Sequence, residues 1–166
     1  WIPLPRFYPV RWTEPRQDTQ RRSGRDARMT KARILCVEDD RDMIDYIKLI
    51  LGKAGFEVIG ADGGAEGLDA MRRELPDLIL LDLMMPGMDG AEVLLQKRED
   101  ETIRDIPVIA LTALNSPFDQ IMWLARTDLQ DFIVKSKLPR KELIARIERA
   151  LQLHAQSSAQ DSGLDD

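Results

Sequence analysis

Two short runs of apolar residues each end in carboxylate side chains, and these carboxylates are the groups in the sequence best suited to chemistry. Residues 78–81 (Leu-Ile-Leu-Leu) lead directly to Asp82, and residues 34–37 (Ile-Leu-Cys-Val) lead to Glu38 and Asp39. A short, unbroken apolar run is typical of a strand that is covered on both faces, as in a parallel sheet. We therefore expect both groups of carboxylates to lie at strand ends.

Carboxylates at the ends of two parallel strands would meet at one edge of the sheet, the edge where open α/β proteins bind ligands. Like charges held close together raise one another's pKa values unless a cation compensates them. Oxygen ligands with no His or Cys nearby favour a hard cation such as Mg²⁺. The sequence therefore predicts a magnesium site that contains Glu38, Asp39 and Asp82.

A regular alternation of strands and helices is predicted around these carboxylates. Asp40 is a candidate N-cap for the first helix, and Pro76 ends the second. Strands are expected at 33–37, 56–59, 78–81, 107–111 and 131–134, and helices at about 40–51, 63–75, 89–98, 118–126 and 139–151. This alternation predicts an α/β fold, a parallel doubly wound sheet of five strands with helices on both faces. Thr112 and Lys135 then lie at the same sheet edge as the carboxylates.

The composition limits the classes of function. The 166 residues carry a net charge of -5, and because residues 1–28 hold seven Arg against three acidic residues, the remainder is strongly acidic. Such a surface does not attract nucleic acid. No apolar run approaches the roughly 20 residues needed to span a bilayer. The lone Cys36 is interpreted as a core residue and excludes a disulfide framework, so we expect a cytoplasmic protein that binds neither nucleic acid nor membrane.

Both ends of the chain differ in composition from its centre. Residues 1–29 are rich in Arg and Pro and show no helix or strand period, which predicts disorder. They are interpreted as an extension upstream of a start at Met29, or alternatively as a basic arm that binds an acidic partner or a membrane. Residues 154–166 are small and polar and are also expected to be disordered. One folded domain is therefore predicted at 30–153.

Four segments in order resemble the receiver domains of two-component response regulators. These segments are Val-Glu38-Asp39, the strand ending at Asp82 with its Leu-Met-Met-Pro-Gly-Met-Asp-Gly loop, Ile-Ala-Leu-Thr112-Ala, and Asp-Phe132-Ile-Val-Lys135. The resemblance covers about residues 31–153. It implies a flavodoxin-like sheet with strand order 2-1-3-4-5.

The resemblance also implies the roles of the acidic residues. Asp82 would be the phosphoacceptor, whose carboxylate attacks the phosphorus of a phosphohistidine or of a small phosphodonor. Asp39 and Asp82 would bind Mg²⁺ directly, together with the backbone carbonyl of Met84, and Glu38 would reach the ion through water.

Three further residues take roles from the same resemblance. Lys135 would place a positive charge against the phosphoryl oxygens, and Thr112 would donate a hydrogen bond to one of them. Phe132 matches the aromatic switch position, whose side chain turns inward behind the moving threonine. One departure from the family pattern is Ser136, which follows Lys135 where a proline in a cis bond is usual.

The implied protein is a signalling module and not an enzyme. Its partners would be a histidine kinase or a histidine phosphotransfer protein, and its output face would comprise the fourth helix, the fifth strand and the last helix. Slow self-dephosphorylation is expected, because Met84 and Leu114, two residues beyond Asp82 and Thr112, cannot orient a water molecule.

Two alternatives remain to be weighed. An aspartyl phosphatase usually needs a second Asp two residues after its nucleophile, a position that Met84 occupies here. A degenerate receiver that binds a partner independently of phosphorylation is the stronger alternative, because Ser136 alters the switch region.

Overall fold

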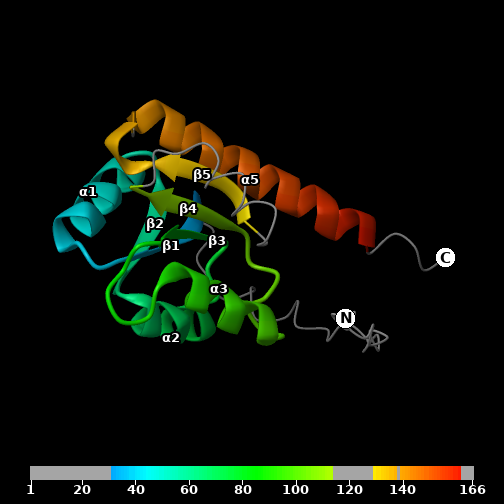
Figure 1. Ribbon diagram of the computed structural model, residues 1–166. Helices are drawn as coiled ribbons and strands as arrows, with labels where there is room; N and C mark the ends of the chain where they lie inside the picture. The colour runs from blue at the N-terminus through cyan, green and yellow to red at the C-terminus, as the bar shows by residue number, and fades with distance from the viewer. Residues whose placement is uncertain (1–30, 114–128, 138, 162–166) are drawn as a thin grey trace, which may run out of the picture.

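Five parallel strands form one sheet in the computed structural model, which describes residues 31–113, 129–137 and 139–161 (Figure 1). The strands are β1 (Lys31–Glu38), β2 (Phe56–Asp62), β3 (Leu78–Asp82), β4 (Val108–Thr112) and β5 (Leu129–Val134). Their order across the sheet is β2-β1-β3-β4-β5, and every neighbouring pair is parallel. The expected fold class and strand order are therefore confirmed.

The helices connect the strands and cover both faces of the sheet. They are α1 (Arg41–Gly52), α2 (Gly64–Glu74), α3 (Gly90–Glu99) and α5 (Arg140–Asp161), with a 3₁₀ turn η1 (Lys135–Lys137) before α5. Figure 1 shows α2 and α3 together below the sheet and α5 above it. The helix expected at 118–126 lies outside the described residues.

Alternating side chains of each strand enter two separate cores. Leu35, Val37, Ile79 and Leu81 pack toward α2 and α3. The residues between them pack toward α1 and α5, and they include Ile34, Cys36, Leu78 and Leu80. Because each central strand is buried on both faces, its sequence is apolar throughout. The strand ends are consequently the places where polar side chains can lie next to the sheet.

Local capping determines where two of the helices begin. Asp40 accepts hydrogen bonds from the backbone N–H groups of Asp42 and Met43, at 2.9 and 3.3 Å, so it is the N-cap predicted for α1. Asp89 accepts from the Glu92 N–H at 2.9 Å and caps α3 in the same way. Each cap satisfies N–H groups that a helix leaves unpaired in its first turn.

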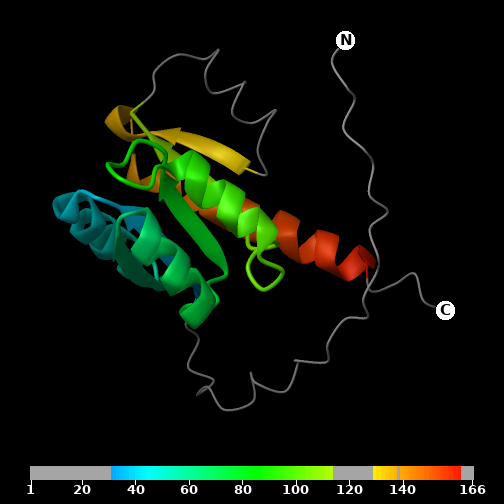
Figure 2. The same cartoon turned by 60° about the horizontal axis from the view of Figure 1, so that its bottom comes forward.

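Helix α5 corrects one predicted boundary. It continues to Asp161, so the disordered tail expected from residue 154 is wrong for residues 154–161. This stretch contains neither Pro nor Gly, and the hydroxyls of Ser157 and Ser158 donate to carbonyls one turn earlier, at 3.0 Å. Polar composition alone does not end a helix that is already nucleated by packing. Figure 2 shows these last turns extending beyond the sheet.

None of the helices in the described ranges combines the length and the apolar character that a membrane span requires.

Gly90 gives a test of the packing that holds α3 against the end of β3. A Cβ atom at Gly90 would lie 2.6 Å from the Leu83 Cα and 2.9 Å from the Asp82 carbonyl oxygen. Because both are backbone atoms, we expect Gly90→Ala to lower the free energy of unfolding by about 1–3 kcal/mol. The control is Gly52→Ala, whose Cβ meets nothing within 4 Å and should change stability by no more than about 0.5 kcal/mol. Urea unfolding measures both, and equal effects would contradict this packing.

Candidate functional site

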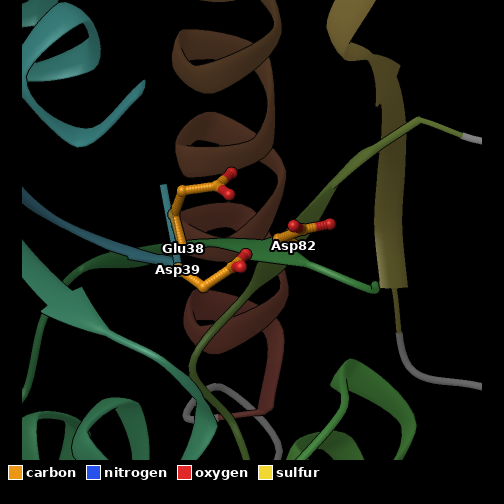
Figure 3. A group of neighbouring side chains, drawn as sticks. All are labelled: Glu38, Asp39 and Asp82. Atoms are coloured by element: carbon orange, nitrogen blue, oxygen red, sulfur yellow. The ribbon is translucent and has the colours of Figure 1, made fainter. Parts of the chain in front are cut away.

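The acidic residues at the ends of β1 and β3 lie together at the carboxyl edge of the sheet. Glu38 is the last residue of β1, Asp39 follows it, and Asp82 is the last residue of β3. Figure 3 shows the three side chains near one another at this edge. One carboxylate oxygen of each residue lies within 4.8 Å of the others. The sequence-based expectation that these groups converge is met, because β1 and β3 are adjacent and parallel.

The three carboxylates differ in their exposure to solvent. Glu38 is 0% exposed and Asp82 is 2% exposed, whereas Asp39 is exposed. Burial of the carboxyl group raises the pKa of Glu38 to about 6, with the charge of Asp82 acting in the same direction and Lys135 opposing it. The site thus has two buried acidic groups behind one that faces solvent, an arrangement that needs a compensating cation.

Lys135 supplies one such cation. Its Nζ lies 2.7 Å from Asp82 Oδ2 and 2.7 Å from Glu38 Oε2. Partial burial acts to lower the pKa of Lys135, but the bonds to the two carboxylates outweigh it and raise that pKa above its ordinary value. Lys135 therefore remains an ammonium group and joins β5 to the ends of β1 and β3.

The peptide bond between Lys135 and Ser136 is trans, since the described residues contain no cis peptide bond. The chain turns into η1 at Lys135, and Ser136 is exposed within this turn. A lysine followed by serine thus reaches the acidic cluster without the cis-prolyl geometry that is usual in the family that the sequence resembles.

The loop after β3 holds the other oxygen of Asp82. The Met84 N–H donates to Asp82 Oδ1 at 3.0 Å, so the Met84 backbone lies beside the carboxylate. The Met84 side chain points away and is 61% exposed. Coordination of a cation by the Met84 carbonyl stays a prediction.

Thr112 and Phe132 occupy neighbouring strands next to the cluster. Thr112 ends β4 and is 0% exposed, and its Cα pairs with Val134 of β5. Phe132 pairs with Ala110 and is 7% exposed, so its side chain is already directed into the core. The structure places both residues where the sequence expected them, and their roles in switching stay predictions.

The donor set fits Mg²⁺. It consists of three carboxylates and contains no nitrogen or sulfur ligand, which is the chemistry that hard cations prefer. Glu38 Oε2 is buried and, apart from its ion contact with Lys135, has no hydrogen-bond partner of acceptable geometry among the described residues. A buried acceptor of this kind gains from a further positive partner.

Two features of the site were missed by reasoning from the sequence. Lys135 was expected to face Asp82, but its equally short contact with Glu38 was not foreseen. Arg146 of α5, which bonds to Asp131 and to the Phe132 carbonyl, was not singled out at all. Its spacing of four residues from Glu142 on a helix was the available signal, because such pairs share a helix face.

Comparison with known proteins gives a consistent result. The family model described as "Response regulator receiver domain" matches residues 34–148. The receiver domain of a signal transduction histidine kinase from Syntrophus aciditrophicus is 31% identical, with 74% of this chain and 91% of that chain covered and a TM-score of 0.66. A Francisella response regulator receiver domain is 29% identical over 74% and 98% of the two chains, with a TM-score of 0.67. The chemotaxis protein CheY4 of Vibrio cholerae is 27% identical over 72% and 98%, with a TM-score of 0.66.

The buried carboxyl of Glu38 predicts a pH dependence of stability. With divalent cations removed, we expect the wild type to lose stability relative to Glu38→Gln as the pH rises through the range from 4.5 to about 6. In this range the folded protein still holds a proton on Glu38 that the unfolded chain has released, so a rise in pH favours unfolding. The relative loss is on the order of 1–2 kcal/mol.

Urea unfolding in EDTA at several pH values measures this difference. Replacement of the exposed Glu99 by Gln is the control, and it should leave the pH profile of the wild type unchanged. A difference between wild type and Glu38→Gln that does not vary with pH would refute the assignment.

Proposed function

Since the chain belongs to the response regulator receiver domain family, we propose that it accepts a phosphoryl group on Asp82 in a magnesium-dependent reaction. The donor is a phosphohistidine of a histidine kinase or of a phosphotransfer protein. The modified domain then signals by contact with a downstream protein. One observation carries the proposal: a buried aspartate at a strand end, bonded to a lysine ammonium and grouped with two other carboxylates.

The transfer step follows from the environment of Asp82. One of its oxygens forms a bond to phosphorus while the bond from phosphorus to the donor nitrogen breaks, and the electron pair of that bond leaves with the nitrogen. The Met84 N–H holds Oδ1 of Asp82 and the Lys135 ammonium holds Oδ2. These two donors fix the plane of the carboxylate before the phosphodonor arrives, which lowers the entropic cost of reaching the reactive geometry.

The charge balance of the site supports the same reaction. Asp39 and Asp82 would hold Mg²⁺, with Glu38 reaching it through water and the Met84 carbonyl as a further ligand. When bound, Mg²⁺ neutralises negative charge on the phosphoryl group. Lys135 keeps its ammonium against the same oxygens, because its raised pKa ensures that it stays charged.

The signal would pass from the phosphoryl group to the sheet through Thr112. Its hydroxyl donates to a phosphoryl oxygen at the end of β4, and the buried Phe132 on β5 accommodates the inward movement. Phosphorylation adds about 1.5 to 2 negative charges at one carboxylate, enough to bias an element that has two arrangements. The output face comprises β5, α5 and the helix expected at 118–126, of which only β5 and α5 belong to the described residues.

A phosphorylation-independent receiver that serves only as a binding module is the alternative. The specific observation in its favour is Ser136, which gives a trans bond after Lys135. The observation against this alternative is that the trans bond still allows the Lys135 Nζ to lie 2.7 Å from Asp82 Oδ2.

Replacement of Asp82 separates the two functions. With acetyl phosphate and Mg²⁺, we expect intact-mass spectrometry to show one added phosphoryl group on the wild type and none on Asp82→Asn, because the amide is not a nucleophile for phosphorus. Asp105→Asn is the matched control, since Asp105 has an 83% exposed side chain and lies outside the acidic cluster. A wild type that gains no phosphoryl group with either acetyl phosphate or a panel of histidine kinases would favour the binding module.

The lifetime of the acyl phosphate is a second expected property. Met84 presents an apolar, exposed side chain two residues after Asp82 and offers no group that could orient a water molecule. Leu114, the other position expected to matter, lies outside the described residues. We propose that the phosphorylated protein loses its phosphoryl group slowly and that the chain is not a phosphatase.

Substitution at Met84 tests this lifetime. We expect Met84→Asn to shorten the half-life of phosphorylated protein several-fold, because the amide can hold a water molecule near the phosphorus, and Met84→Leu to leave it unchanged. The decay of phosphorylated protein after removal of the donor gives both half-lives. Loss of the phosphoryl group from the wild type within seconds would contradict the prediction.

A further inference from the structure

Arg146 of α5 makes a connected set of hydrogen bonds at the outer edge of β5. Its Nη1 donates to both carboxylate oxygens of Asp131, at 2.8 Å each, and to the Phe132 carbonyl oxygen at 3.1 Å. Its Nε and Nη2 donate to Glu142 Oε1 at 3.1 and 2.7 Å. We refer to Arg146 and Asp131 together as the edge clamp. The guanidinium is thus held both by the strand and by its own helix.

The edge clamp satisfies backbone groups that β5 would otherwise leave unpaired. Among the described residues β5 is the last strand of the sheet, and no strand of these residues pairs with its outer side. The Phe132 N–H donates to Asp131 Oδ1 at 2.8 Å, and the Phe132 carbonyl accepts from Arg146. Asp131 Oδ1 also accepts from Arg146, so the bonds form a closed ring around the Phe132 backbone.

This ring of hydrogen bonds lies close in the sequence to the lysine of the acidic cluster. Phe132 lies three residues before Lys135, whose ammonium contacts Asp82 and Glu38. β5 stays extended as far as Val134, and Lys135 follows directly as the first residue of η1. Because an extended strand has little freedom at each residue, the backbone position at Phe132 constrains where the strand ends and where Lys135 begins. The short segment from Phe132 to Lys135 therefore connects the edge clamp to the lysine of the acidic cluster.

The surroundings of Arg146 suit a positioning role better than a purely stabilising one. The side chains of Arg146 and Asp131 are each 36% exposed, so solvent screens part of their attraction and limits what the pair adds to stability. An arginine fork that is fixed from two sides has instead a defined orientation, which a flexible surface lysine would lack. The hydrogen bonds of Arg146 to both β5 and α5 therefore suit a residue that sets the position of the strand.

We propose that Arg146 is a positioning residue, which holds the segment from Phe132 to Lys135 in the arrangement that receives a phosphoryl group at Asp82. This inference rests on the proposed function and names a residue on α5 that governs the same site. Helix α5 and the phosphoryl site are then coupled in both directions, since coupling between two sites is reciprocal. A protein that binds α5 and disturbs the edge clamp would alter uptake of the phosphoryl group.

Binding of beryllofluoride in the presence of Mg²⁺ tests the inference without any kinase. Titrations followed by amide NMR shifts compare the wild type with Arg146→Gln. We expect roughly three- to thirtyfold weaker beryllofluoride binding in the variant, the usual size of such coupling. Affinity for Mg²⁺ alone is expected not to fall, because none of the three carboxylates is touched. Arg149→Gln, at an exposed arginine of the same helix, should match the wild type.

Two further variants keep the test decisive if Arg146→Gln folds poorly. Asp131→Asn retains an acceptor for the Phe132 N–H but weakens the pair with Arg146, so it should also weaken beryllofluoride binding. Arg146→Lys keeps the charge without the fork and should give an intermediate affinity. Melting temperatures of all variants report stability separately.

The outcomes distinguish this inference from the function on which it rests. A wild type that binds no beryllofluoride would overturn both. If the wild type binds it and the Arg146 and Asp131 variants bind it equally well, the inference alone fails. It also fails if affinity for Mg²⁺ and for beryllofluoride drop in parallel, because that pattern indicates general loosening.

Discussion

The contact of one ammonium group with two buried carboxylates is the interaction on which the rest of this structure depends. Glu38 and Asp82 are almost inaccessible to solvent, and buried negative charge is costly unless a positive group lies beside it. Lys135 provides it from the turn that follows β5, a strand that is adjacent to neither β1 nor β3. The acidic cluster contains three carboxylates and one ammonium group, and its oxygen donors are of the kind that hard cations prefer.

The sheet supplies this contact through its topology. In a parallel sheet every strand ends at the same edge, so residues more than forty positions apart come within a few ångströms of one another. The two hydrophobic cores pack against both faces of the central strands, so the strand ends have little freedom to move. The close approach of Gly90 to the backbone at Asp82 and Leu83 extends the same tight packing to the loop that bears Met84. Precision at the site is therefore a property of the packed sheet and of the loops that follow it.

The outer edge of β5 connects the acidic cluster to the surface of the protein. An edge strand has unpaired backbone groups, and here an arginine and an aspartate satisfy those of Phe132. The strand that leads to Lys135 is thus tied to α5 by side-chain hydrogen bonds.

The sequence by itself determined the class of fold, the five strands, the acidic cluster of Glu38, Asp39 and Asp82, and the cap at Asp40, because these follow from local periodicity and from the rule that parallel strands end together. It also placed Thr112 and Phe132 on the correct strands and Lys135 at the carboxyl end of the last one. Only the tertiary structure decided that Lys135 follows a trans path and contacts Glu38 as well as Asp82, that α5 continues to Asp161, and that Arg146 closes the edge of β5. These features depend on contacts between residues that are far apart in the sequence, or on packing that stabilises a helix. The spacing of residues within one segment does not predict either of them.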